Sequence, residues 1–341
     1  MNIKEIARKA GVSVATVSRV LNHPDRVAEE TRNKIQEIMR ESDYSPNWFA
    51  QSLNFHKTGT IGLLIPNILN PGYTEIAKGV EDVAHQKNCT TLLCNGEEDA
   101  AKERNYIDTL IRRQVDGIVL VSSNLERKDI EHIRRQGIPV VQIGEDRGDH
   151  DVPTVRTDCA GASEKAVRHF LENGKTRIAF VQGVKPELEN KRKLMGYQQA
   201  MKASECLVAA GYIQETENSI EGGYIAGKRL LNLDPPPDAI FASSDILAFG
   251  VMEALKDNEV RIPEDVGVIG FDNIRMSSLI EPRLTTVAKP MHKMGLVGAR
   301  LLFDLMESED QEMPANREIL LQSKLKIRKS CGNLEQIDEI F

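Results

Sequence analysis

The stretch that decides how the chain is organised is residues 3–23, which read IKEIARKAGVSVATVSRVLNH. Ile3, Ile6 and Ala10 recur at the spacing of one helix face, and this spacing predicts a first amphipathic helix. Gly11 is expected to end that helix, because glycine adopts the left-handed conformation at no steric cost. A second helix follows at once. Two short helices joined by a tight turn that contains glycine form a helix-turn-helix.

The second helix is predicted to run from Ser13 to about Leu21. Ser13 suits the N-cap, because its side-chain oxygen can accept a hydrogen bond from a free backbone N–H. Val17 and Val20 lie on the face that would pack against the first helix. The first 20 residues hold four basic side chains against Glu5 alone. Basic helical hairpins also occur in proteins that never contact DNA, so charge and periodicity leave both interpretations open.

A third helix is predicted over residues 29–42, and a turn at residues 44–46 ends this headpiece. Residues 47–54 form at most two helical turns, which are marginal by themselves in water. This segment nevertheless carries the large apolar side chains Trp48, Phe49 and Leu53. Two interpretations stay open for it. It is either a linker helix packed on its own domain, or a hinge that folds on a partner and inserts an apolar wedge between bases.

From Thr60 onward, short apolar strands alternate with amphipathic helices. The predicted strands are 61–66, 90–94, 117–121, 139–144, 177–183, 217–221, 239–243, 266–272, 284–288 and 318–328. The predicted helices are 73–88, 99–113, 126–136, 188–204, 222–232, 245–257 and 291–307. Apolar strands between helices indicate parallel βαβ units with both sheet faces covered. The pattern occurs twice, which predicts two similar α/β lobes, and we expect the late elements to cross back between them.

Ligands of such sheets bind beyond the carboxyl ends of the strands, and the residues expected there are polar. They are Asn67, Asn70, Asn95, Glu97, Ser122, Ser123, Glu145, Asp146, Ser244, Asp245, Asp272 and Asn273. Two lobes that present such edges to a shared crevice suit a small, hydroxyl-rich ligand, since each buried hydroxyl needs a donor or acceptor. For any one of these residues the alternative is a helix N-cap, and Asp245 in particular opens a helix.

Composition and charge bound the class of protein. The 341 residues suffice for two or three domains. The net charge of −7 divides unevenly, because residues 1–57 hold nine Lys and Arg against seven Asp and Glu, which leaves −9 on the remainder. There is no apolar run of about 18 residues, and Met1 leads into a charged amphipathic helix rather than a secretion signal. We therefore expect a cytoplasmic protein without a membrane span.

The residues that could carry catalysis or bind metal form no recognised arrangement. The five cysteines are expected to be reduced thiols, and they are Cys89, Cys94, Cys159, Cys206 and Cys331. Neither zinc-ligand spacing nor a phosphate-loop, dinucleotide, serine-hydrolase or zinc-protease motif is present, so we predict no metal, cofactor or catalytic residue. Two alternatives come from other classes. An α/β enzyme would need a nucleophile or acid–base pair in the crevice, and a transport binding protein would need an export signal.

Nine motifs along the chain match one family in the expected order. They are IKEIARKAGVSVATVSRVLN, YSPN, AQSL, TGTIGLLIPNILNPGY, VDGIVL, GIPVV, IAFVQG, IPEDVGVIGFDN and LTTVAKPMHKMG. On these motifs, the chain resembles the LacI/GalR family of bacterial transcription regulators over almost its whole length. The resemblance implies an all-α helix-turn-helix headpiece with a hinge helix, followed by a periplasmic-binding-protein-like core of two doubly wound parallel-sheet lobes. It also implies a homodimer that represses transcription from a near-palindromic DNA operator.

The resemblance assigns DNA contacts by position. Val14 and Ala15 match residues that face base edges in the major groove, and Arg19 matches a base or phosphate contact, in agreement with what apolar groups and guanidinium groups can read. The positions that match contacts to the DNA backbone are Thr16, Ser18, Asn22, Tyr44 and Asn47. Leu53 matches the leucine that wedges into the minor groove, and Gln51 stands where the family often has arginine.

The resemblance also implies an effector, a sugar or sugar derivative, in the crevice between the lobes. The effector-binding candidates are Asn70, Tyr73, Ser122, Lys193, Ser244 and Asp272. Many members have arginine where Lys193 stands and asparagine where Ser244 stands, and lysine cannot reproduce the bidentate guanidinium fork. At these two positions the chain is similar to the catabolite-control branch of the family. Members of that branch respond to a phosphorylated phosphocarrier protein. Residues 289–302 resemble the region through which that branch contacts its carrier protein. Arg300 stands at a matching position, whereas His292 stands where that branch has tyrosine.

Four segments follow from the motifs and the pattern of elements. We predict the headpiece over 1–46, the hinge over 47–58, the core over 59–331 and a tail over 332–341. The first lobe is expected to hold about 59–158 plus 289–317, and the second about 159–288 plus 318–331. The tail has too few apolar repeats for a coiled coil, which favours a dimer over a tetramer.

We expect Leu53→Ala to weaken operator binding, because it removes the apolar group that would separate the central bases. A gel-shift titration with a palindromic duplex measures this, and thermal unfolding of the core checks that the substitution leaves the core folded. An operator affinity equal to that of the wild-type protein would rule out the wedge.

Overall fold

The computed structural model describes residues 2–22, 26–42, 58–145, 152–184, 188–206, 208–308 and 317–332. The chain divides into two compact units, Met1–Thr58 and Gly59–Phe341. The predicted headpiece residue Tyr44 lies outside the described residues. So do the predicted hinge residues Asn47, Gln51 and Leu53, and the tail after Gly332. Within the described part, no helix has the length and apolar character needed to cross a membrane.

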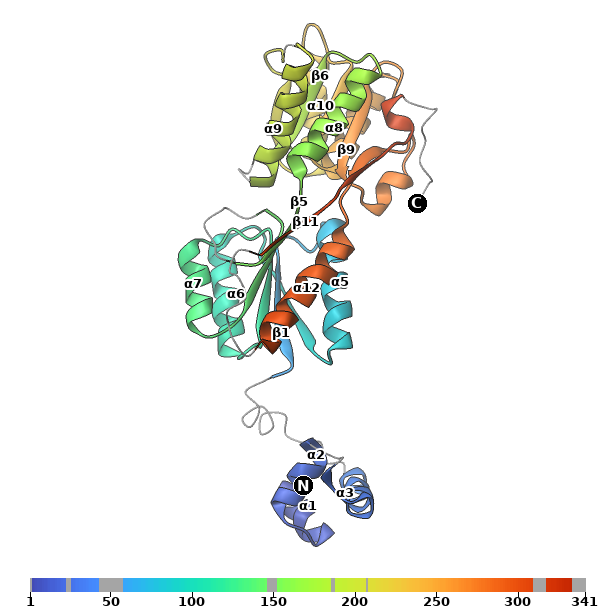
Figure 1. Cartoon of the computed structure of the whole chain (residues 1–341). Helices are drawn as coiled ribbons and strands as arrows, with labels where there is room; N and C mark the ends of the chain where they lie inside the picture. The colour runs from blue at the N-terminus through green and yellow to red at the C-terminus, as the bar shows by residue number, and fades with distance from the viewer. Residues whose placement is uncertain are drawn as a thin grey trace. The chain divides into compact units, whose positions relative to one another are not determined.

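The first unit contains α1 (Ile3–Ala10), α2 (Val14–Asn22) and α3 (Glu29–Glu41) (Figure 1). Asn2 caps α1 by accepting a hydrogen bond from the backbone of Glu5, whose side chain accepts one from Asn2 N in return. Gly11 ends α1 with a φ of 71°, as the sequence predicted. The three helices share one small core, formed by Ile6, Ala7, Ala10, Val17, Val20, Ile35 and Met39.

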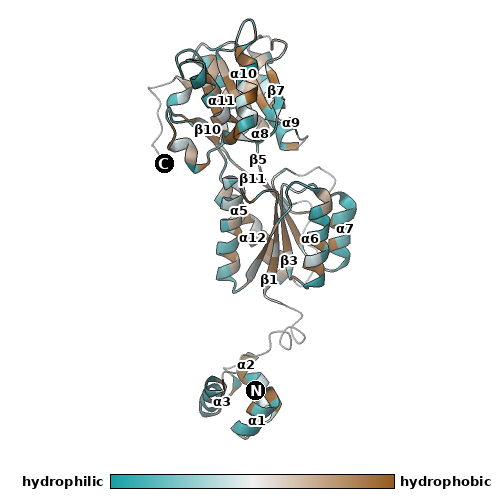
Figure 2. Ribbon diagram, turned by 180° about the vertical axis from the view of Figure 1, so that it is seen from behind, coloured by the Kyte–Doolittle hydropathy of each residue, from teal (hydrophilic) through white to brown (hydrophobic). Residues whose placement is uncertain are grey.

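The first lobe of the second unit is built on a parallel six-stranded sheet with the order β11-β5-β4-β3-β1-β2. Its strands are β1 (Thr60–Ile65), β2 (Thr90–Asn95), β3 (Gly117–Val121), β4 (Val140–Ile143), β5 (Thr154–Thr157) and β11 (Glu318–Leu321). One face is covered by α5 (Pro71–Gln86) and α12 (Met291–Glu307), the other by α6 (Ala100–Arg112) and α7 (Arg127–Arg135) (Figure 1). Figure 2 shows hydrophobic strands between helices whose outer faces are hydrophilic.

The second lobe repeats this plan with the strand order β12-β10-β9-β8-β6-β7. Its strands are β6 (Ile178–Gly183), β7 (Ile213–Thr216), β8 (Ala239–Ala242), β9 (Gly267–Asp272), β10 (Thr285–Ala288) and β12 (Lys324–Lys326). All pair in parallel except β12, which runs antiparallel to β10. The covering helices are α8 (Cys159–Glu172), α9 (Leu188–Ala203), α10 (Ile220–Leu231) and α11 (Asp245–Asp257). The predicted fold class is confirmed.

Several details of the sequence prediction were wrong. The strand predicted at 217–221 lies at Ile213–Thr216, because Ser219 caps α10 by accepting a hydrogen bond from Gly222 N at 3.0 Å. The single strand predicted at 318–328 is two strands, β11 in the first sheet and β12 in the second. Residues 318–321 therefore belong to the first lobe, not to the second. The strand β5 and the helix α8 that follows it were not predicted at all.

The chain passes between the two sheets three times, after β5, after β10 and after β11. The first two crossings leave the carboxyl ends of parallel strands, so the carboxyl edges of the two sheets lie on the sides that the crossings join (Figure 1). We use the name strand-end face for the residues that follow the carboxyl ends of the parallel strands in both sheets, together with the crossings.

Close packing of α5 against α12 depends on two glycines. A Cβ atom added at Gly79 would lie 2.2 Å from the carbonyl oxygen of His292, and one at Gly295 would lie 2.1 Å from that of Ile76. Both obstacles are backbone atoms that a side-chain rotation cannot clear. The pair α5 and α12 covers one face of the first sheet, and α12 leads directly from the crossing after β10.

We expect Gly79→Ala to lower the free energy of unfolding of the core by roughly 2 kcal/mol, because overpacking forces the two backbones apart. Gly72→Ala on the same helix is the control, since its Cβ would meet the flexible end of Met291 at 3.1 Å. Urea unfolding of both variants measures the difference. Equal losses in the two variants would show that the α5–α12 contact is not the constraint.

Candidate functional site

The helix α2 divides its side chains between a buried face and an exposed one. Ser13 caps it, as predicted, by accepting a hydrogen bond from Thr16 N at 3.1 Å. Val17 and Val20 are buried against α1 and α3. On the opposite side Val14, Ala15 and Arg19 are exposed, and Val14 keeps 40% of its surface exposed. The helix therefore presents two small apolar groups and a guanidinium outward.

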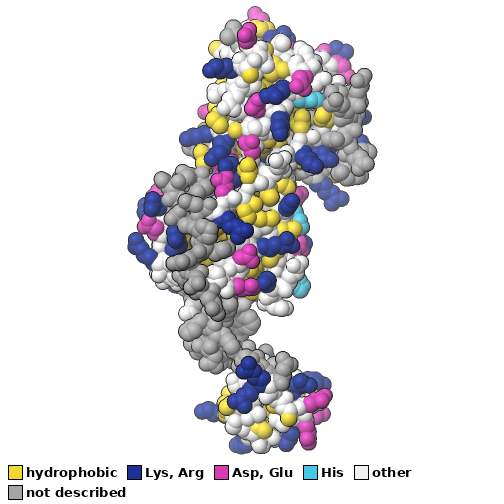
Figure 3. Space-filling view, in the orientation of Figure 1, with side chains coloured by type: hydrophobic (Ala, Val, Ile, Leu, Met, Phe, Trp, Pro, Cys, Tyr) yellow, Lys and Arg dark blue, Asp and Glu magenta, His cyan; other side chains and the backbone are white. Residues whose placement is uncertain are grey.

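The other predicted DNA contacts on α2 are Thr16, Ser18 and Asn22. Thr16 is half-buried and its hydroxyl lies 2.9 Å from that of Ser13, and Ser18 is also half-buried. Asn22 is the last residue of α2. On the face of the headpiece that Figure 3 shows, Lys and Arg side chains lie in several places, and acidic side chains gather at one edge.

The first lobe contributes three of the predicted effector residues to the strand-end face. Asn70 is the N-cap of α5, and its side-chain oxygen accepts a hydrogen bond from Gly72 N at 2.9 Å. Tyr73, one turn further, is half-buried against the apolar core. Ser122 directly follows β3 in a left-handed conformation with φ of 41°, and its N–H donates to Ile143 O at 2.8 Å. Left-handed non-glycine residues often mark functional sites.

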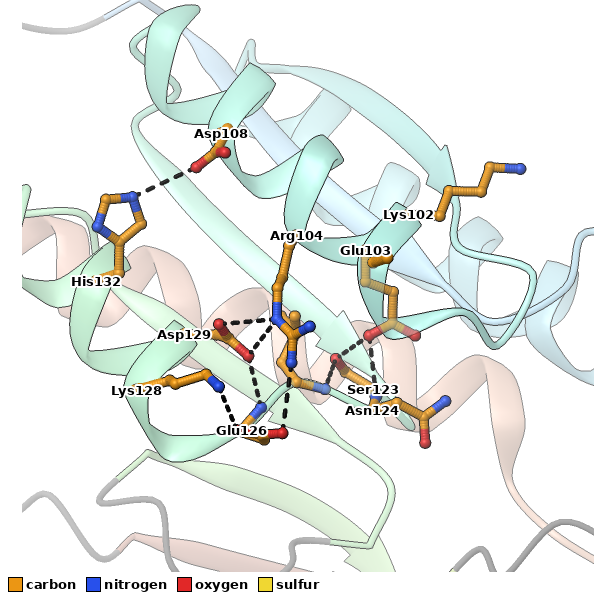
Figure 4. Close-up of polar contacts among 12 residues, drawn as sticks. Lys102, Glu103, Arg104, Asp108, Ser123, Asn124, Glu126, Lys128, Asp129 and His132 are labelled. Carbon is orange, nitrogen blue, oxygen red and sulfur yellow. Dashed lines mark hydrogen bonds and ion pairs between the residues drawn. The ribbon is translucent and has the colours of Figure 1, made fainter.

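A buried carboxylate holds the loop that begins at Ser122. Glu103, only 1% exposed, accepts hydrogen bonds from Ser123 Oγ at 2.7 Å and Asn124 N at 2.9 Å (Figure 4). Asn124 also donates through Nδ2 to Glu98 O at 3.3 Å. The loops after β2 and β3 are thereby tied together at the edge of the first sheet.

The second lobe contributes Ser244 and Asp272. Ser244 is the N-cap of α11, where its Oγ accepts from Leu247 N at 3.2 Å and donates to Asn218 Oδ1 at 2.7 Å. The N-cap interpretation was thus correct for Asn70 and for Ser244. Asp272 ends β9 with φ of 108°, and burial raises the pKa of its carboxyl, while Lys193 and Lys289 oppose that rise.

Lys193 is almost fully buried on α9 and has several partners. Its Nζ lies 2.7 Å from Glu189 Oε1, donates to Ser243 O at 2.8 Å and lies 4.0 Å from the centre of the Phe271 ring. Glu189 Oε1 is also 2.9 Å from the Nζ of Lys289, which lies in the crossing after β10. The charge of Lys193 is thus shared among three groups of the protein.

An ion pair between Arg192 and Glu145 also joins the two lobes. Arg192 Nε on α9 lies 2.8 Å from Glu145 Oε2, which follows β4 of the first sheet. Burial raises the pKa of Glu145, although Arg192 opposes the rise. Sequence reasoning placed Glu145 at the sheet edge but missed Glu189, Arg192 and Lys289. The only available signal was the spacing of Glu189 and Lys193 by four residues, which puts them on one helix face.

Asp245 fixes the loop that follows Asp272. It is fully buried, and it accepts hydrogen bonds from Ile274 N at 2.9 Å, Ser277 Oγ at 2.6 Å and Thr286 Oγ1 at 2.5 Å. The sequence offered Asp245 as a helix-opening residue, and it does begin α11. Its side chain turns instead into the sheet edge, where it holds the β9 loop in place.

The strand-end face brings together acceptors, donors and balanced charges from both lobes. Lys193 and Asp272 are close enough to perturb each other's pKa, and Asn70, Ser122 and Ser244 line strand ends of the two sheets. Such a face can bind a small polar ligand by hydrogen bonds. Across the residues that the structure describes, no three His, Cys, Asp or Glu side chains are grouped to hold a metal ion.

Comparison with known proteins gives matches for both units. Residues 2–47 match the model of bacterial regulatory proteins of the lacI family, and residues 167–331 match a periplasmic binding protein-like domain. Catabolite control protein A of Priestia megaterium is 36% identical over 310 residues, which cover 91% of this chain and 93% of that protein. The ribose operon repressor of Halalkalibacterium halodurans is 37% identical, with 90% and 91% covered.

A solved structure agrees with these matches. The crystal structure of a LacI family transcriptional regulator from Enterococcus faecium with bound ribose is 31% identical and has a TM-score of 0.72. The match covers 80% of this chain and 98% of the Enterococcus faecium chain.

The buried carboxyl of Asp245 is expected to make the stability of the protein depend on pH. Burial raises its pKa from 3.8 to about 7, with Asp272 adding to the rise. A raised folded-state pKa means that the protonated form is favoured in the folded protein, so this contribution to stability is complete below about pH 4 and is lost as pH rises through about 7.

We therefore expect Asp245→Asn to flatten the decline of unfolding free energy between these pH values, because asparagine does not ionise. Urea unfolding of the wild-type protein and the variant at several pH values measures this. Parallel profiles for the two proteins would mean that Asp245 does not titrate in this range.

Proposed function

The chain belongs to the LacI family of bacterial regulatory proteins, and from this premise we propose that it is a DNA-binding transcriptional repressor of carbohydrate-related genes. The observation that carries the proposal is the exposed face of α2, which presents Val14, Ala15 and Arg19 from a capped, well-packed helix. A major groove admits a helix of this kind, where arginine can bond guanine and small apolar groups can contact thymine methyls.

The remaining contacts in this proposal go to phosphates and to the minor groove. Thr16, Ser18 and Asn22 hold the phosphate backbone near α2. Tyr44 and Asn47 add backbone contacts, and the segment with Gln51 and Leu53 enters the minor groove. In the proposal a homodimer in the cytoplasm places two such headpieces on a near-palindromic operator, about one turn of DNA or a multiple of it apart.

The strand-end face is the proposed effector site, and the effector is a sugar or sugar derivative. Support comes from the polar side chains of both lobes at this face, and from the bound ribose named for the Enterococcus faecium regulator. Asn70, Tyr73, Ser122, Lys193, Ser244 and Asp272 are the proposed contacts. A ligand held by both lobes alters DNA affinity only if it favours one arrangement of the core over another.

A second candidate is control by a phosphorylated phosphocarrier protein. It is favoured by the similarity to catabolite control protein A and by Arg300, which is exposed on α12 and can bind phosphate. His292 on the same helix lies 2.8 Å from Asp82 Oδ2, so part of this surface is engaged within the protein. Calorimetry with sugars and with the phosphorylated carrier separates the two candidates. Tight sugar binding without any carrier response removes the second.

The DNA-binding proposal is tested by Arg19→Ala. We expect the variant to lose affinity for its selected palindromic duplex by roughly 10-fold or more and to relax base preference, since a bidentate base contact is worth about 1–3 kcal/mol. Lys34→Ala, exposed on α3, is the matched control and should leave the preference between sequences unchanged.

Binding of randomised duplexes followed by sequencing measures both affinity and preference. A uniform loss over all sequences would make Arg19 a phosphate contact. Failure of the wild-type protein to prefer any palindrome over random duplex would overturn the proposed function.

A further inference from the structure

One carboxylate oxygen on the strand-end face has two ammonium groups as neighbours. Glu189 Oε1 lies 2.7 Å from Lys193 Nζ and 2.9 Å from Lys289 Nζ. The side chains of the two lysines are only 4% and 7% exposed, and that of Glu189 is 16% exposed. Two buried positive charges thus converge on one point that a single negative charge occupies.

The surroundings of that point strongly favour a negative charge. Burial alone would raise the pKa of Glu189, but Lys193 and Lys289 together outweigh it and hold the pKa well below its usual range. The carboxylate also lies in the first turn of α9, where the helix dipole stabilises anions. The lysines come from different elements, α9 and the crossing after β10, so the arrangement is not a local helix pair alone.

Acceptors for hydroxyl groups lie around the same charges. Among the residues that the structure describes, none is aligned to donate a hydrogen bond to either oxygen of Glu145, although Arg192 Nε is 2.8 Å from Oε2. Burial raises the pKa of Glu145 and of Asp272. Both groups can accept hydrogen bonds from ligand hydroxyls.

Charge balance decides what can take the place of Glu189. A neutral ligand that displaced the carboxylate would leave the two ammonium groups with Asp272 as their remaining acidic neighbour, one carboxyl group for two buried positive charges, which is unfavourable. A ligand that brings its own anionic group exchanges one negative charge for another. Lys193 cannot offer the fork of an arginine, but a point charge suits a phosphate or carboxylate oxygen.

We propose that the effector of this site is a hydroxyl-rich anion, a sugar phosphate or sugar acid, and that Glu189 is an internal competitor for its anionic group between Lys193 and Lys289. The inference rests on the proposed function, because it assigns a ligand class to the same face. Glu145 and Asp272 accept hydrogen bonds from the ligand's hydroxyls.

The test uses the full chain and three matched probes: ribose, ribose 5-phosphate and ribonate, each titrated by calorimetry. Glu189→Gln removes the competing charge and nearly preserves side-chain volume, and Glu189→Ser is a second variant should the first not fold. Each is also combined with Lys289→Met. Lys202→Met, an exposed lysine on the same helix, is the control for that substitution. Circular dichroism confirms that each protein is folded.

We expect Glu189→Gln to bind ribose 5-phosphate or ribonate at least 10-fold more tightly than the wild-type protein, about 1.4 kcal/mol, with little change for ribose. Lys289→Met should abolish the gain and Lys202→Met should not. The probe that gains most distinguishes a phosphate from a carboxylate ligand.

Three results would overturn the inference. They are equal changes for ribose and its anionic derivatives, no gain with either anion in both Glu189 variants, and a gain that survives Lys289→Met. Ribose binding without any anion effect would leave the proposed function standing while removing this inference. Loss of palindrome preference, measured separately, would concern the proposed function alone.

Discussion

Every charge buried on the strand-end face needs a partner, and this constraint fixes the loops that meet there. A carboxylate away from water is tolerated only when donors or cations surround it. Glu103 holds the loop after β3, Asp245 holds the loop after β9, and Glu189 holds Lys193 and Lys289. The positions of Ser122 and Asp272, both left-handed, therefore depend on buried carboxylates that need not touch a ligand.

The same constraint bears on how a ligand can regulate the core. A ligand shifts an equilibrium only by the difference between its interactions with two states. The contact between Glu145 and Arg192 joins the end of β4 to α9. The contact between Glu189 and Lys289 joins α9 to the crossing after β10. Because the side chains of Glu145, Glu189 and Lys289 are mostly buried, the free energy of these pairs responds to any new charge or hydroxyl beside them. They are the contacts through which binding at the face can favour one arrangement of the lobes.

Much of the fold could be predicted from local patterns, because apolar strands between amphipathic helices leave few alternatives. The helices at 245–257 and 291–307 have the predicted bounds. The strand β5, Thr154–Thr157, escaped prediction because half its residues are polar threonines that the fold nonetheless buries. The crossing between β11 and β12 also escaped, since a strand that changes sheets looks continuous in sequence.

The site was less predictable for a related reason. Lys193 and Asp272 were predicted as effector contacts from the family resemblance. Glu145 and Asp245 were predicted from their positions after the carboxyl ends of strands. Lys289 lies 100 positions from Glu189, and nothing local marks the two as partners. Pairing over that distance is a product of the fold, and only the structure reveals it.

The neighbours of Lys193 explain why a lysine suits this position. Its ammonium lies 4.0 Å from the centre of the Phe271 ring and also reaches Ser243 O and Glu189 Oε1, three directions that a compact charge can satisfy together. A planar guanidinium directs its donors within one plane, which matches a single bidentate partner better than this arrangement. Lys193, Glu189 and Lys289 thus form one set of linked charges. A change at any of the three alters the charge that the other two require.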